Sequence, residues 1–204
     1  MGQQEIGNLS HGEAQERYTL VPLRELDLES ESDLTAYFQM LTHPSNIEHI
    51  ISPPEDVEDL KRKLVRDETF TYIAENMLGE IVGAGGINDA SQGEHDHFMV
   101  KVVVSPDYKG TDIEKNLFAA LTDKAFTTSA RDERERLKLD IAVIRDVNDW
   151  DRVPRILREL GYNFRSFLPN QVDVFDQRLG KIEIKPTERW EIESEEWPSL
   201  SENP

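Results

Sequence analysis

The stretch of sequence that decides the fold is residues 102–121, which read VVVSPDYKGTDIEKNLFAAL. Three valines favour a β-strand, and a turn that contains Pro and Gly follows them. Thr111 and Glu114 then have the spacing of a capping box, which predicts the start of a helix with Leu117 and Leu121 on one face. The start of a helix presents backbone N–H groups that can bind an anion.

Amphipathic patterns on both sides of this stretch predict the other elements. Before it we expect a strand at 18–24, helices at 33–41 (with Asp33 as N-cap), 45–51 and 55–65, and strands at 70–75, 80–84 and 98–104. After the helix at 111–126 we expect a strand at 137–144, a helix at 150–160 that ends at Gly161, and strands at 163–167 and 171–178. This mixture predicts an α/β (α+β) domain with a mixed, mostly antiparallel central sheet flanked by helices.

Composition changes at both ends of the chain. Residues 1–17 are rich in Gln, Glu, Gly and Ser, and they predict a flexible N-terminal arm. Residues 181–204 are rich in Glu and predict an acidic C-terminal tail, which could dock in part through Trp190 or Trp197. The expected folded domain is therefore 18–180.

The charge of the chain restricts its partners. It has 41 Asp and Glu residues against 23 Lys and Arg residues, so its formal net charge is −18. Nucleic acids and anionic membrane surfaces attract basic proteins, so neither is an expected partner. A cationic amine would be attracted instead. Cysteine is absent, which excludes disulfides, thiolate catalysis and Cys-ligated zinc.

Nothing in the sequence predicts a membrane segment. A membrane-spanning helix needs a run of about 18 or more apolar residues, and no such run is present. Residues 1–17 also lack the apolar region of a signal peptide. We therefore expect a cytoplasmic protein. The sequence carries no indication of its oligomeric state.

The segment Val104-Ser105-Pro106-Asp107-Tyr108-Lys109-Gly110, with the helix after it, resembles the acetyl-CoA segment of the GNAT superfamily of N-acetyltransferases, V-x-P-x-[YF]-[RK]-G-x-G-[IL]-G-x-x-L. The N-terminal part is similar to the branch that acetylates ribosomal protein N-termini and small amines. Asn148 and the later Leu160-Gly161-Tyr162 resemble the end of the family's domain. The resemblance covers roughly residues 18–178 and implies the GNAT fold.

The resemblance also implies an activity and a cofactor site. The activity is transfer of an acetyl group from acetyl-CoA to an amine of a small molecule or a protein. The end of the strand before Pro106 would hold the pantetheine arm, in a splay between this strand and the strand at 137–144. Backbone amides at the helix start would hold the pyrophosphate. The implied cofactor-binding residues are Val102, Val103, Val104, Lys109, Gly110, Thr111, Asp112, Ile113, Glu114 and Asn148.

Four positions depart from the family pattern. Asp112 and Glu114 replace the second and third glycines and bring negative charge to the anion site. Leu157 stands at the position of the general-acid Tyr, and Phe98 stands at the position of the Glu that some members use as a base. These departures motivate an alternative function, a GNAT-fold binding or regulatory module that has lost standard coenzyme A binding and catalysis.

Two further side chains are candidates for proton transfer. His97 belongs to Glu94-His95-Asp96-His97 and adjoins the family's base position, so it could act as a general base. His95 and His97 would share one face of a strand, but no third ligand is identifiable, and we predict no metal site. Solvated histidines are the plainer interpretation. Tyr162 could donate a proton in place of the missing Tyr, although the matching position in the family usually packs in the core.

Overall fold

The structure is a computed structural model that describes residues 21–50, 52–66, 70–76, 78–88, 96–127, 138–145, 147, 149–176 and 181–197. The helices are α2 (Glu31–Thr42), α3 (Pro44–Ile47), α4 (Val57–Arg66), α5 (Asp112–Thr127) and α6 (Arg152–Glu159), with short 3-10 turns η1 (Pro106–Tyr108) and η2 (Ser194–Glu196). The strands are β1 (Leu23–Glu25), β2 (Phe70–Glu75), β3 (Ile81–Asn88), β4 (Asp96–Val104), β5 (Lys138–Ile144), β6 (Asn163–Asp176) and β7 (Lys181–Glu193). The predicted fold class is confirmed.

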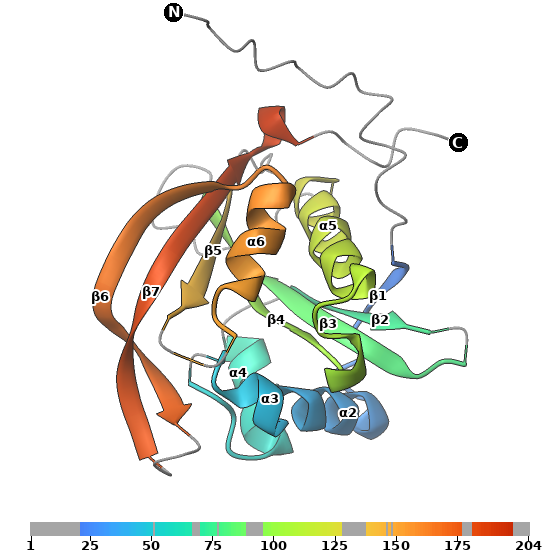
Figure 1. Ribbon diagram of the computed structural model, residues 1–204. Coiled ribbons are helices and arrows are strands. Elements are labelled where there is room, and N and C mark those ends of the chain that lie inside the picture. Colours follow the sequence, from blue (N-terminus) through green and yellow to red (C-terminus); the bar gives the residue numbers. More distant parts are fainter. Residues whose placement is uncertain are drawn as a thin grey trace, which may run out of the picture.

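The seven strands form one sheet in the order β1-β2-β3-β4-β5-β7-β6 (Figure 1). Among the strand pairs that the structure describes, β4 and β5 are the only parallel one, and the others are antiparallel. Parallel neighbours need a crossover, and here α5 supplies it between β4 and β5. The sheet is therefore mixed and mostly antiparallel, as the sequence predicts.

Helices cover both faces of the sheet. One hydrophobic cluster joins α5 and α6 to the sheet and contains Val104, and a second joins α2 and α4 to the sheet and contains Val103. Neighbouring residues of a strand point to opposite faces, so β4 contributes to both cores. Because β4 packs against a helix layer on each face, its sequence can be continuously apolar, as in the valine run at 102–104.

Two glycines of β3 let α5 approach the sheet closely. A Cβ atom at Gly83 would lie 2.6 Å from Leu117 Cδ2, and one at Gly85 would lie 2.4 Å from Leu121 Cδ1. Both leucines are buried. The register between β3 and β4 also shifts between Ala84 and Gly86, an irregularity that glycines within a strand favour.

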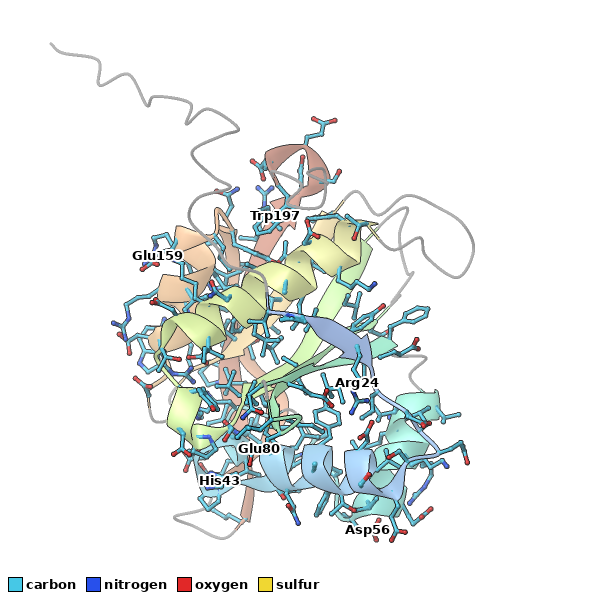
Figure 2. All side chains as sticks on the ribbon, turned by 90° about the vertical axis from the view of Figure 1, so that its right-hand side faces the viewer. Arg24, His43, Asp56, Glu80, Glu159 and Trp197 are labelled. Atoms are coloured by element: carbon cyan, nitrogen blue, oxygen red, sulfur yellow. The ribbon has the colours of Figure 1, made fainter. Side chains whose placement is uncertain are left out.

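The prediction of an acidic tail at 181–204 is wrong for most of its described residues. Residues 181–193 form β7, which lies inside the sheet between β5 and β6. The domain therefore extends past residue 180. Trp190 and Trp197 are both buried, and Trp197 lies beside α5 with its Nε1 3.5 Å from Asp123 Oδ1 (Figure 2).

The strands expected at 163–167 and 171–178 are instead one long strand, β6, with a register shift between Leu168 and Val172.

Ion pairs across strands make the acidic β7 compatible with a sheet interior. Lys138 of β5 lies 2.8 Å from Glu191, and Arg165 of β6 pairs with the same carboxylate. Burial raises the pKa of Glu191, but the hydrogen bonds from both cations outweigh it, and the net pKa lies below the usual range. The nearby Glu188 is buried too, with Arg145 3.3 Å away. These glutamates are buried because cations from neighbouring elements neutralise them.

Helix α2 begins earlier than predicted. Its N-cap is Ser30, whose side chain accepts a hydrogen bond from the Asp33 amide at 3.3 Å, so Asp33 is not the cap. Asp33 instead pairs with Arg24 of β1, at 2.6 Å, and the hydrogen bonds from Arg24 hold the pKa of the Asp33 carboxyl below its usual range.

No helix in the described part of the chain is long and apolar enough to cross a membrane.

We predict that Gly85→Ala lowers the free energy of unfolding by about 1–3 kcal/mol, because the added methyl group overpacks the contact with Leu121. Urea denaturation of Gly85→Ala, Leu121→Val and the double variant measures the coupling. Leu121→Val removes the Cδ atom that the new methyl group meets, so Gly85→Ala should cost less in that background. Equal costs in the two backgrounds would contradict this account of the β3–α5 contact.

Candidate active site

The central feature of the site is a divergence between β4 and β5. The two strands pair from Asp96↔Lys138 to Met99↔Ile141, but both continue beyond that point, to Val104 and Ile144. Figure 1 shows them running together at one end and separating toward the other. Beyond that point each strand stays paired with its other neighbour in the sheet: β4 with β3, and β5 with β7. We call the gap between 100–104 and 142–144 the β4–β5 opening.

The β4–β5 opening contains a cavity of about 60 Å³. Its lining residues are His49, Val102, Phe118, Ile141, Ala142, Val143, Ile144 and Val153. Phe118 and Val153 belong to the layer of α5 and α6, whereas His49 follows α3 in the other layer. Residues from both helix layers thus line the cavity. It is small, and His49 is the titratable group among the residues that line it.

Sequence reasoning missed His49, because a histidine in a short helical segment carries no signal of its own. The structure explains its position. Asn46 of α3 is buried, and its Nδ2 donates hydrogen bonds to Met40 O at 2.8 Å and Val104 O at 3.0 Å. The His49 amide in turn donates to Asn46 O at 2.8 Å. Asn46 therefore ties the segment that carries His49 to the end of β4.

The start of α5 holds a carboxylate of its own chain. The Gly110 amide donates to Glu114 Oε2 at 2.8 Å, and the Arg152 guanidinium of α6 pairs with Glu114 Oε1. Glu114 is 4 % exposed and Arg152 is 7 % exposed. Asp149 Oδ2 lies 2.8 Å from Arg152 Nε and adds a second carboxylate. Burial lowers the pKa of Arg152 from its usual range, and the charge of Arg155 lowers it further.

The predicted capping box is wrong in its details. Glu114 reaches back to the Gly110 amide, and not to that of Thr111, while Thr111 Oγ1 donates to Tyr108 O at 2.7 Å. Gly110 has a φ of +70°, which a glycine adopts without strain. This conformation turns its amide toward the glutamate. The two acidic replacements therefore differ, because Glu114 is buried in the first turn of α5 and Asp112 is exposed.

Beside this carboxylate lies a polar pocket of about 370 Å³ between α5 and α6. It is lined by Gly110, Thr111, Asp112, Lys115, Asp149, Arg152, Arg155, Ile156 and Glu159. Each cation among these residues lies near a carboxylate: Lys115 near Glu159, Arg155 near Asp151, and Arg152 near Glu114 and Asp149. The pocket lies where the resemblance implies an anion site, but carboxylates of the chain already pair with its positive charges.

Lys109, the basic residue of the motif, turns away from this pocket. Its Nζ donates to Ser45 O of α3. Burial, and to a smaller extent the charge of Arg152, lowers the pKa of Lys109 to about 8. In Figure 2 the labelled His43, which precedes α3, lies close to the turn that leads into α5, in agreement with this contact. Lys109 thus connects the motif to the layer of α2–α4.

The other predicted site residues are placed as follows. Val102 lines the β4–β5 opening, Val103 and Val104 are buried in opposite cores, and Ile113 is half-buried in the first turn of α5. Asn148 and His95 lie outside the described residues. His97 is placed by its backbone only, opposite Leu139 in the β4–β5 ladder.

Tyr162 is buried and its hydroxyl lies 2.7 Å from Thr122 Oγ1. Thr122 donates its one proton to Phe118 O, so Tyr162 is the donor of this bond. Burial raises the pKa of Tyr162 above its usual range. Tyr162 and the buried Leu157 both pack in the core.

The two ends of coenzyme A, which the resemblance implies, would meet different surroundings. The thioester end of the pantetheine arm would lie at the β4–β5 opening, whose cavity of about 60 Å³ is too small to enclose the whole arm. The diphosphate does not fit the start of α5 as it stands, because Glu114 already accepts the Gly110 amide and pairs with Arg152. Two like charges about 4 Å apart repel by about 1 kcal/mol in water and about 4 kcal/mol near a protein surface. Glu114 would have to move for a phosphate to bind there.

Comparison with solved structures shows the same fold. The crystal structure of spermidine N-acetyltransferase from Vibrio cholerae, in complex with CoA and spermine, superposes with a TM-score of 0.67. It is 13 % identical, and the match covers 86 % of this chain and 96 % of that one. A probable acetyltransferase (GNAT family) from Chromobacterium violaceum ATCC 12472 superposes with a TM-score of 0.64 at 18 % identity, over 89 % of this chain and 91 % of that one. Comparison with curated protein sequences finds no significant match.

A family model agrees with the structural comparison. The acetyltransferase (GNAT) family model matches residues 34–143, which run from α2 through β5 and include the β4–α5 motif and the β4–β5 opening. Members of this family use acetyl-CoA, and the match supports acetyl transfer to an amine. The alternative of a binding module without activity is not favoured. The chain therefore belongs to the GNAT family of acetyltransferases.

Proposed function

We propose that this chain acetylates a cationic amine at the β4–β5 opening, with His49 as the group that accepts the proton. The observation that carries the proposal is the cavity in this opening, which is apolar except for His49. Bound acetyl-CoA would supply an acetyl thioester, whose carbonyl carbon forms a bond to the amine nitrogen while its bond to sulfur breaks. Val102–Val104 of β4 and Ala142–Ile144 of β5 would border the arm that carries the thioester.

The sheet would separate the two substrates. The polar pocket at the start of α5 lies in one helix layer, and His49 follows α3 in the other. The donor would thus enter from the α5–α6 side, and the acceptor would approach from the side of α2–α4. This arrangement places the amine near His49, which is half-buried.

The amine must lose a proton in the course of the reaction, since a protonated amine has no electron pair to attack with. A neutral imidazole can accept that proton directly or through a water molecule, and the ordinary pKa of histidine of about 6.5 suits this role near neutral pH. The departing sulfur takes up a proton as the thiol forms. We assign the first transfer to His49, whose segment Asn46 holds against β4.

The preference for a cationic acceptor is supported by the net charge of −18, which raises the local concentration of cations and speeds their encounter with the protein. It is also supported by the similar fold of the spermidine N-acetyltransferase that holds spermine. We propose polyamines as the first acceptors to test. The cytoplasmic location expected from the sequence stays a prediction.

We predict that the chain releases free thiol from acetyl-CoA with spermidine as acceptor, and that kcat/KM falls as salt is raised, because screening weakens the attraction of a polycation. A thiol assay with spermidine, a monoamine and a neutral hydroxylamine at two salt concentrations measures this preference. Equal kcat/KM for the three acceptors, with no effect of salt, would contradict a cationic acceptor. Failure with every amine would contradict the proposed activity.

We further predict that His49→Gln lowers kcat about 10²- to 10⁴-fold, the usual contribution of a positioned base. The step in the pH profile, where kcat falls toward acidic pH as the base is protonated, should also disappear, because no imidazole remains in the cavity. His43→Asn is the matched control. It removes an imidazole from the same segment but keeps a side chain that can cap α3, as His43 does through the Ser45 amide. If both variants behave alike, or His49→Gln keeps the step, His49 is not the base.

A further inference from the structure

The anion site at the start of α5 is built around a residue of the chain itself. Glu114 accepts a hydrogen bond from the amide of Gly110, two residues before α5 begins, and pairs with the buried Arg152. An amide at a helix start and a guanidinium are the two kinds of group that usually bind a phosphate. In this chain the Glu114 carboxylate, which is also an oxyanion, binds both of these groups.

The contacts of Glu114 set it apart from the other acids nearby. It is 4 % exposed and has an amide partner as well as a cation partner. Asp112 and Asp107 are exposed. Charge-assisted hydrogen bonds of this kind are stronger than neutral ones, and burial strengthens them further. Glu114 is therefore held in the anion site, whereas Asp112 and Asp107 add only solvated charge around it.

The β4–β5 opening is independent of this contact. Its lining residues come from β4, β5, α5, α6 and the segment after α3, and Glu114 is not among them. The part of the donor that carries the thioester can therefore bind while Glu114 keeps its partners. A donor that lacks the diphosphate meets no repulsion from Glu114, and a donor that carries it does.

We infer that Glu114 determines donor specificity: the chain holds its donor mainly by the pantetheine arm and accepts acetyl-pantetheine, which lacks the nucleotide diphosphate, nearly as well as acetyl-CoA. The inference rests on the proposed acetyl transfer at the β4–β5 opening. It assigns to Glu114 a positioning and specificity role and no part in bond making. Arg152 becomes the partner that keeps Glu114 in place.

The test compares kcat/KM for acetyl-CoA and acetyl-pantetheine with one amine acceptor. The parent should prefer acetyl-CoA by less than about tenfold. In Glu114→Gln the preference for acetyl-CoA should rise ten- to hundredfold, since about one charge-assisted contact with phosphate is gained. Only kcat/KM for acetyl-CoA should change, and kcat/KM for acetyl-pantetheine should stay the same. Asp107→Asn, which removes the same charge from an exposed site three residues before Gly110, should change the preference by less than about threefold.

A binding measurement keeps this inference apart from the proposed activity. Calorimetry with inorganic pyrophosphate at low salt should show binding to Glu114→Gln at least about tenfold tighter than to the parent. Thermal unfolding shows whether each variant is folded, and Glu114→Ala provides a second variant if Glu114→Gln is not. A parent that strongly prefers acetyl-CoA, or variants that bind pyrophosphate no better than the parent, would overturn the inference. Absence of acetyl transfer with tighter pyrophosphate binding would overturn the proposed function only.

Discussion

The early end of the β4–β5 ladder is the constraint on which the site depends. Four residue pairs hold these strands in parallel, from Asp96↔Lys138 to Met99↔Ile141, and each strand then follows its antiparallel neighbour. The strands remain parts of one sheet, so their pairing with β3 and β7 sets the gap between them. The crossover helix α5 starts just beyond the end of β4, which brings an anion site close to an apolar opening. Both parts of the proposed acyl-donor site thus follow from one parallel pair.

The Glu114–Arg152 contact changes what the anion site can do. A helix start with a free glycine amide would bind a phosphate, but here the amide and the guanidinium share a carboxylate of the same chain. Burial makes this contact costly to break unless another anion replaces the carboxylate. The family fold is therefore retained, while the part of the site that meets the nucleotide is altered. In contrast, the β4–β5 opening, where we propose that the reacting group binds, is apolar apart from the titratable His49.

Much of the fold could be predicted because its signals are local. Alternating apolar residues and the valine run marked β2 and β4, and the turn around Gly110 marked the start of α5 within one residue. Strand β7 was missed because its glutamates looked like a solvated tail. Glu191 is buried only because Lys138 and Arg165, from other strands, neutralise it. In the site, the acidic departures at 112 and 114 were visible in the sequence, but their different roles were not, since Arg152 lies 38 residues from Glu114. His49 reaches the cavity only through the packing of α3 against β4.

The most direct test of the account is a calorimetric titration of coenzyme A into the parent and into Ala142→Phe. Ala142 is exposed and lines the β4–β5 opening, so a large side chain there would fill the opening without disturbing the core. We expect saturable binding to the parent, and binding at least about tenfold weaker in Ala142→Phe with an unchanged unfolding midpoint. Ala142→Ser, which stays small, should bind as the parent does. Equal affinity for the parent and Ala142→Phe would contradict the claim that the donor occupies the opening between β4 and β5.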